Sequence, residues 1–164
     1  MRNKKVLFIT QAAMIAALYV VLTKLISAFN LASGAIQIRI SEMLCILPVF
    51  TPAAIPGLFA GCLIANTITG SIIWDIIFGS IATLVGAAGT YLLRKKPFIY
   101  TLPPVITNMI TVPLVLRFAY HVNSAIWFMA VTVGIGEAVS VCVLGFILKK
   151  ALWKHRAVIF RNED

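Results

Sequence analysis

The sequence predicts an all-α integral membrane protein with six transmembrane helices and both termini in the cytoplasm. Of its 164 residues, 61% are hydrophobic and 12% are charged, whereas a soluble domain is about half apolar and about one quarter charged. The apolar residues form long runs, and the basic residues cluster at the ends of these runs. We therefore expect a single transmembrane domain over residues 1–164.

Three apolar runs are long enough to cross a bilayer as helices, for which about 20 residues suffice: residues 6–29, 72–93 and 125–148. A fourth run, residues 98–116, contains three prolines but stays apolar and has about the required length. The first run follows basic residues, as in a signal peptide, but it is longer than the apolar part of one. We expect it to be retained as a membrane span.

The segment of residues 40–69 is too long for one span and short for two. Basic residues precede the first run and recur at Arg94, Lys95 and Lys96, and such clusters mark the cytoplasmic ends of spans. If both clusters are cytoplasmic, an even number of spans separates them, so residues 40–69 contribute two or none. Because the segment is apolar and residues 51–54 (TPAA) suit a turn, we expect two helices of about 15 residues, each about 22 Å long.

The net charge of +9 does not indicate a nucleic-acid surface. Of the 14 lysines and arginines, three precede the first apolar run, three stand together at residues 94–96 and five lie in residues 149–161. These clusters flank membrane spans, which is how basic residues encode orientation. The basic excess is therefore interpreted as a topology signal.

The sequence contains no catalytic or metal-binding pattern. Cys45, Cys62 and Cys142 lie inside apolar segments without metal-ligand spacing, so they are interpreted as packing residues and not as a disulfide framework. His121 has no second histidine or cysteine nearby and is interpreted as a surface residue. We expect no enzymatic activity, metal or cofactor in this chain, and transport driven by ATP would need partner proteins.

The predicted topology brings the loops around residues 30–40, 69–75 and 117–124 to the outer side of the membrane. Polar residues gather there, whereas the inner side carries the basic clusters and little else. This distribution predicts a polar pocket that opens outward. Its candidate residues are Gln37, Arg39, Glu42, Asn66, Trp74, Asp75, Arg117, Tyr120, His121, Asn123 and Trp127.

The last span carries a second candidate element of the site. Trp127, Ala130, Gly134 and Glu137 share one face of a helix, because their spacing follows a period of 3.6 residues. A ring, two small residues and a carboxylate on one face would form a slot for a flat ligand that makes hydrogen bonds. Asn108 is a mid-membrane amide, which becomes a ligand contact if it faces Glu137. Ionisable groups inside a membrane are costly and usually functional.

Each of these polar residues also has a structural alternative. Glu137 would instead pair with an arginine or lysine of a neighbouring helix, and Asn108 would join two helices by a hydrogen bond. Asp75 and Glu42 stand near the starts of predicted helices, where a carboxylate complements the helix dipole. The sequence leaves these alternatives open.

The first helix carries two overlapping pairs of alanines four residues apart, Ala12/Ala16 and Ala13/Ala17. Small residues at this spacing let a second helix approach closely in lipid. That helix belongs either to the same chain or to another membrane protein. Small residues of later helices are assigned to packing inside the chain: Gly57, Gly61, Ala65, Gly79, Ala82, Gly86 and Gly89.

Five blocks of the sequence resemble the QueT family. They are residues 37–42 (QIRISE), 47–48 (LP), 51–59 (TPAAIPGLF), 61–66 (GCLIAN) and 75–84 (DIIFGSIATL). From the fifth helix onward the likeness rests mainly on Asn108 and Glu137. Members of this family are the substrate-binding S components of energy-coupling factor (ECF) transporters assigned to queuosine precursors.

The resemblance implies a six-helix S component in the plasma membrane of a prokaryotic cell. Its first helix would dock through the alanine pairs on a transmembrane coupling protein, and two cytoplasmic ATPases would complete the importer. The S component would bind its ligand from outside and topple in the membrane to release it inward. Gln37 and Arg39 would lie in a loop that caps the pocket.

The implied ligand is a 7-deazaguanine such as 7-aminomethyl-7-deazaguanine, or queuine. A guanine-like edge presents adjacent N–H and amino donors, which one carboxylate can accept together, and an oxygen that needs a donor. The flat ring would stack on tryptophan, and an aminomethyl cation would seek a second carboxylate or an aromatic face. The residues expected to supply these contacts are Glu137, Asn108, Trp127, Trp74, Asp75 and Glu42, with Gln37, Arg39 and Asn66 at the mouth.

Two other functions remain compatible with the sequence. The first is an S component for another vitamin or small heterocycle. The second belongs to a different class, a structural membrane subunit whose polar residues only hold helices together. The structural subunit would bind no ligand saturably.

Overall fold

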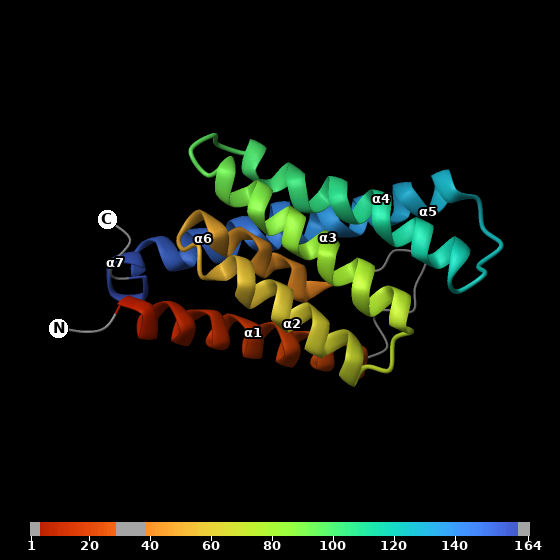
Figure 1. Cartoon of the computed structure of the whole chain (residues 1–164). Coiled ribbons are helices and arrows are strands. Elements are labelled where there is room, and N and C mark those ends of the chain that lie inside the picture. Colours follow the sequence, from red (N-terminus) through yellow and green to blue (C-terminus); the bar gives the residue numbers. More distant parts are fainter. Residues whose placement is uncertain (1–3, 29–38, 161–164) are drawn as a thin grey trace.

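The computed structural model describes residues 4–28 and 39–160, and every regular element in these ranges is a helix. This confirms the predicted all-α class. The elements follow in chain order (Figure 1): α1 Lys4–Ala28, η1 Ile40–Val49, α2 Ala54–Ile68, α3 Ile73–Leu92, η2 Ile99–Thr101, α4 Leu102–Phe118, α5 Ile126–Glu137, η3 Ala138–Leu144, α6 Gly145–Trp153 and α7 Arg156–Ile159.

Four helical stretches in the described residues are long and apolar enough to cross a membrane. They are Lys4–Ser27, Ile73–Leu92, Ile99–Phe118 and Ile126–Trp153, and each matches one predicted apolar run. The last stretch is continuous through α5, η3 and α6. The chain is therefore a multi-pass membrane protein, while the count of six spans remains a prediction because η1 and α2 are shorter apolar helices.

The segment of residues 40–69 folds as two short helices with a turn between them, as predicted. The first helix differs from the expectation, since η1 is a 3₁₀ helix of 10 residues and not an α-helix of about 15. A 3₁₀ helix rises about 2.0 Å per residue, so η1 extends about 20 Å where an α-helix of the same length would reach about 15 Å. The tighter winding therefore compensates for the shortness of the segment.

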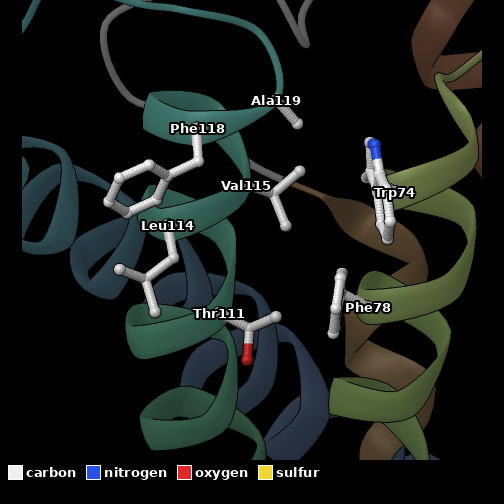
Figure 2. Close-up of a pocket in the computed structure, with 7 residues that line it drawn as sticks. All are labelled: Trp74, Phe78, Thr111, Leu114, Val115, Phe118 and Ala119. Atoms are coloured by element: carbon white, nitrogen blue, oxygen red, sulfur yellow. The ribbon is translucent and has the colours of Figure 1, made fainter.

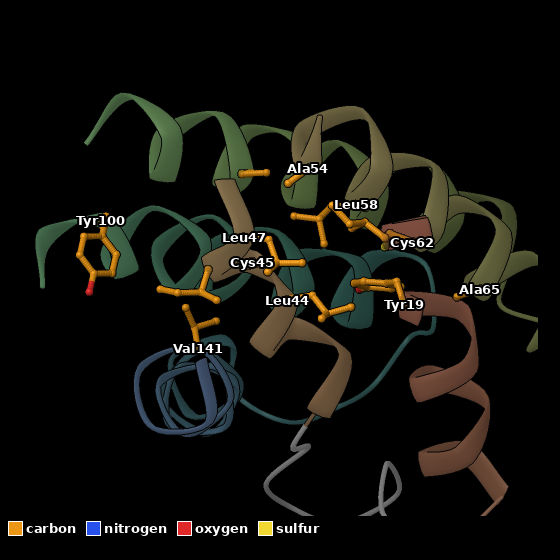
Figure 3. Packing of buried hydrophobic residues seen from close by; sticks show 13 residues of the cluster. Tyr19, Leu44, Cys45, Leu47, Ala54, Leu58, Cys62, Ala65, Tyr100 and Val141 are labelled. Carbon is orange, nitrogen blue, oxygen red and sulfur yellow. The ribbon is translucent and has the colours of Figure 1, made fainter. Parts of the chain in front are cut away.

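The helix η1 lies at the centre of the bundle. Seven of its ten residues are buried, and it packs against α1, α2, α3, α6 and η3. Figure 3 shows Leu44 and Leu47 of η1 among Tyr19, Leu58 and Val141 of the surrounding helices. The helices α4 and α5 pack in turn against α3 and η3, which are neighbours of η1.

Two helix pairs approach closely at glycines. A Cβ atom at Gly61 of α2 would lie 2.8 Å from the Cβ of Tyr19 and 3.0 Å from the carbonyl oxygen of Ala16, both in α1. A Cβ atom at Gly89 of α3 would lie 2.5 Å from the Cβ of Pro103 in α4. These contacts confirm that the small residues of α2 and α3 serve packing inside the chain, as small residues do in membrane helix pairs.

Nine of the twelve lysines and arginines in the described residues gather at one end of the bundle; the exceptions are Lys24, Arg39 and Arg117. Figure 1 shows that the start of α1, the connection between α3 and α4, and helices α6 and α7 all lie at this end. We call it the basic end, and it carries Lys4, Lys5, Arg94, Lys95, Lys96, Lys149, Lys150, Lys154 and Arg156. The α2–α3 and α4–α5 connections lie at the opposite end.

Candidate functional site

Glu42 of η1 is fully buried, and hydrogen bonds within the chain satisfy both of its oxygens. Its Oε1 accepts a hydrogen bond from the hydroxyl of Tyr19 in α1, and its Oε2 accepts one from the Sγ of Cys45 at 3.0 Å. Buried carboxylates need such donors because their water is lost. Glu42 therefore joins η1 to α1, and it also lies in the first turn of η1, near a helix start as the sequence suggested.

Glu137 and Asn108 are buried as deeply as Glu42, but each retains a polar atom without a partner. Glu137 is the last residue of α5 and 3% exposed, and Asn108 lies in α4 and is 1% exposed. The Oε2 of Glu137 and the Nδ2 of Asn108 make no hydrogen bond within the described chain. Each such atom loses its full hydration energy, about 1–3 kcal/mol or more for a charged group.

The two unpartnered groups belong to one polar cluster in the bundle. Glu137 interacts electrostatically with Glu42 and Arg39 and lies beside the amide of Asn108. The sequence hypothesis that Asn108 faces Glu137 is thus consistent with the structure. Helix geometry also changes at this point, because the seven-residue π-helix η3 begins directly after Glu137, and π segments occur frequently at functional sites.

A chain of polar contacts leads from this cluster towards the end opposite the basic end. The guanidinium Nη2 of Arg39 donates to the Oδ1 of Asn66 at 3.1 Å, and the Nδ2 of Asn66 donates to the carbonyl oxygen of Asp75 at 3.5 Å. The hydroxyl of Tyr120 donates to the Oδ2 of Asp75 at 3.2 Å. Four predicted candidate residues, Arg39, Asn66, Asp75 and Tyr120, are therefore brought together.

These residues line a pocket of about 370 Å³, a size in the range of small-molecule sites. Its walls come from α1, the start of η1, the end of α2, the start of α3 and the end of α4. Val112 of α4 is in the lining, and Asn108 lies one helical turn, about 6 Å, deeper along the same helix. The polar lining residues are Thr23, Ser27, Arg39, Ser41, Asn66, Thr69, Ser71, Asp75 and Tyr120.

A second hollow, between α3 and α4, is apolar and separate from this pocket. It has a volume of about 440 Å³, and Trp74 and Phe78 of α3 face Val115 of α4 across it (Figure 2). Trp74 stacks on Phe78 at a centroid distance of 5.9 Å and is 54% exposed. The predicted stacking residue Trp74 therefore lines the apolar hollow and not the polar pocket.

Trp127 is also directed away from the buried carboxylate. Its side chain is 71% exposed and packs edge-on against Phe128. It precedes Glu137 by ten residues, about 15 Å along the helix. Gly134, which lies between them, faces Met109 of α4, so the slot for a flat ligand remains a prediction.

The two alanine pairs of α1 separate into different environments. Ala16 is buried and Ala12 is half-buried, and their backbones lie where Cβ atoms on Gly61 and Gly57 would clash with them. Ala13 and Ala17 are exposed on the other face of α1. Only the second pair remains open to a partner. Gln37, the predicted lid residue, lies outside the described residues.

Sequence reasoning missed the residues that hold Glu42. Cys45 was interpreted as an apolar packing residue, but its thiol donates to a carboxylate. Tyr19 was not considered, although it lies three residues after Ala16 on the same face of α1. A tyrosine on a buried face usually finds a hydrogen-bond partner, so that placement was a usable signal.

The chain is similar to known proteins over most of its length. The family model described as QueT transporter matches residues 9–154. The chain is 30% identical to the queuosine precursor transporter QueT of Lactococcus lactis subsp. cremoris (strain MG1363), over 92% of this chain and 95% of that protein. No solved structure matches the chain.

Proposed function

The chain belongs to the QueT transporter family, and from this premise we propose that it is the substrate-binding component of an ECF importer for a queuosine precursor. The relative from Lactococcus carries the name of a queuosine precursor transporter. The proposal extends that substrate class to this chain. It adds a binding site, an orientation and partners.

The unpartnered atoms of Glu137 and Asn108 carry the proposal. Together they offer one acceptor and one donor in a buried place. A guanine-like edge offers the complement, since its ring N–H and amino group donate and its exocyclic oxygen accepts. A bound 7-deazaguanine would therefore satisfy both groups, which buried polar atoms require.

The contrast between the two buried carboxylates supports a different role for each of them. Glu42 already accepts hydrogen bonds on both oxygens from Tyr19 and Cys45. Glu137 has a free oxygen. We therefore assign the donor edge of the ring to Glu137, and Glu42 to holding η1 in place beside it.

The pocket residues supply a site for a cationic substituent of the ring. Asp75 is half-exposed in the pocket wall, and it is the acidic residue among the described lining residues. An aminomethyl group on the ring carries a positive charge at neutral pH, because alkylamines are protonated there. Asp75, supported by Tyr120 at 3.2 Å, is the proposed partner of that charge.

The charges at the ends of the bundle support the proposed orientation. Basic residues favour the cytoplasmic side, so the basic end faces the cytoplasm and the polar pocket opens to the outside. Uptake then needs partners that supply energy. A coupling protein would dock on Ala13 and Ala17, and two ATPases would hydrolyse ATP in the cytoplasm.

The proposal is tested by ligand binding to the purified protein. We expect 7-aminomethyl-7-deazaguanine to bind saturably in calorimetry and to raise the unfolding temperature, as a ligand of the native state does. The analogue that lacks the exocyclic amino group of the guanine edge should bind at least tenfold more weakly. Stabilisation by a vitamin panel without response to deazaguanines would identify another substrate. No saturable ligand at all would favour the structural-subunit alternative.

A further inference from the structure

A groove on α6 at the basic end belongs to neither the polar pocket nor the alanine face. It has a volume of about 360 Å³ and is lined by Phe146, Lys149, Lys150 and Trp153. The spacing of these residues places them on one face of the helix. Phe146, Lys150 and Trp153 are exposed at this face.

The groove has an apolar part and a cationic part. Phe146 stacks on Phe98 with ring centroids 6.2 Å apart. One turn further towards the basic end, the Nζ of Lys149 donates to the hydroxyl of Tyr100 at 2.9 Å. The same ammonium lies 4.4 Å from the centroid of the Tyr100 ring and 5.6 Å from that of Trp153. These contacts with aromatic side chains fix the position of the Lys149 ammonium group. An ordinary surface lysine has no such contacts.

The charge around the groove is not compensated within the described chain. Its acidic residues are Glu42, Asp75 and Glu137, which lie in the bundle core or in the polar pocket at the opposite end. The rest of the basic end adds further positive charge, including Arg94 and Arg156. An anion is therefore the complementary occupant of this groove.

The position of the groove along the helix matches a membrane boundary. Trp153 follows Phe146 by seven positions, so the groove extends over about 10 Å of helix. Tryptophan and lysine at the end of a span lie at the level of lipid headgroups, and residues one or two turns deeper contact acyl chains. Basic pockets on the cytoplasmic side of membrane proteins bind anionic lipid headgroups.

We infer that the α6 groove binds an anionic phospholipid. The headgroup phosphate pairs with Lys149 and Lys150 beside Trp153, and an acyl chain lies along Phe146 and Phe98. The bound lipid neutralises part of the positive charge at the basic end. This site is independent of the polar pocket, because the two lie at opposite ends of the bundle.

The test measures lipid binding to purified full-length protein. Native mass spectrometry and thermal unfolding are carried out with phosphatidylglycerol, with phosphatidylcholine and with inorganic phosphate. The variant Lys149→Gln/Lys150→Gln is compared with Lys95→Gln/Lys96→Gln, which removes the same charge from exposed positions at the same end. The single variant Lys150→Gln leaves the contact of Lys149 with Tyr100 intact. It therefore shows whether lipid affinity falls when this structural contact is kept.

We expect wild type and Lys95→Gln/Lys96→Gln to retain phosphatidylglycerol and to be stabilised by it. Affinity should fall roughly fivefold for each groove lysine removed, the factor that corresponds to about 1 kcal/mol per basic side chain near an anionic surface. Equal losses in the two double variants would overturn the proposal, because they would show nonspecific attraction. Equal stabilisation by phosphatidylcholine or by inorganic phosphate alone would also overturn it.

Discussion

The hydroxyl of Tyr19 donates a hydrogen bond to the carboxylate of Glu42, and this contact joins α1 to η1 in the interior of the bundle. The two residues are 23 positions apart, and both are fully buried. The bond occupies one oxygen of Glu42 and leaves Glu137 as the buried carboxylate with a free oxygen. It thereby determines which acidic residue is available to a ligand.

Removal of this hydroxyl should destabilise the protein. The Tyr19→Phe variant keeps the ring but leaves the Oε1 of Glu42 without its donor, which costs about 1–3 kcal/mol of unfolding free energy. The measurement is thermal or denaturant unfolding in detergent. Tyr91→Phe is the control, because Tyr91 is half-exposed and contacts Arg94 through its ring, which phenylalanine retains. Equal effects of the two variants would contradict the role of the Tyr19 bond.

The Glu137→Gln variant should lose ligand affinity and gain stability without ligand. The amide can accept only one of the ligand donors and carries no charge, so a loss of about 1.5–3 kcal/mol, roughly 10- to 100-fold in Kd, is expected. The empty protein is stabilised because an uncharged amide costs less to bury than a carboxylate with an unpartnered oxygen. Calorimetry gives the first quantity and unfolding of the ligand-free protein gives the second.

Ligand affinity and the stability of the ligand-free protein are measured on the same sample, so that the two effects of the substitution can be compared. A purely structural Glu137 would lose stability on substitution and leave no ligand effect to measure. If affinity is unchanged while stability falls, the assignment of Glu137 to the ligand is wrong.

The Asp75→Asn variant should discriminate between ligands by charge. An aminomethyl deazaguanine loses its proposed ion pair and binds about tenfold more weakly, since a hydrogen bond to a charged group contributes about 1.5–3 kcal/mol and partial exposure reduces it. A neutral 7-methyl analogue should bind wild type and variant equally. Equal losses for both ligands in calorimetry would place the cation elsewhere.

Substitution of the exposed alanines should separate assembly from folding. The Ala13→Leu/Ala17→Leu variant adds bulk to the open face of α1, so copurification with the coupling protein and uptake should be lost while ligand binding persists. Met14→Leu is the control, because Met14 is exposed on α1 and the change conserves volume. Unaltered copurification of the alanine variant would remove this face from the docking proposal.

The Gly61→Ala variant should weaken the α1–α2 contact. Its Cβ would meet the Cβ of Tyr19 at 2.8 Å and the backbone of Ala16 at 3.0 Å, and such overpacking costs about 1–3 kcal/mol. Gly134→Ala is the matched control. Its Cβ would meet the Sδ of Met109 at 2.9 Å, and the flexible methionine side chain can move aside. Unfolding temperatures should therefore fall for Gly61→Ala and change little for Gly134→Ala.

Local signals in the sequence were sufficient for most of the fold. Long apolar runs predicted the four helical stretches that can span a membrane, because hydropathy and length are properties of contiguous residues. The turn predicted at residues 51–54 (TPAA) correctly divided the segment of residues 40–69. The basic clusters also predicted which connections meet at one end of the bundle.

The site was less accessible to sequence reasoning, because it depends on how helices rotate about their axes. Trp74 and Trp127 suited a flat ligand by chemistry, yet both side chains are exposed away from the buried cluster. Tryptophan is also enriched at membrane interfaces, and a single sequence does not distinguish these two uses. The rotation of α1 about its axis also decides which alanine pair faces α2 and which is exposed, and the sequence alone did not predict this.

The sequence alone determined the all-α membrane class, the family resemblance and the cost of placing Asn108 and Glu137 in a membrane. Only the tertiary structure decided that η1 is a central 3₁₀ helix and that Tyr19 and Cys45 satisfy Glu42. It also decided that Glu137 and Asn108 each keep an unpartnered atom. Hydropathy is read residue by residue, whereas the hydrogen-bond partners of a buried group come from other helices and depend on how those helices pack.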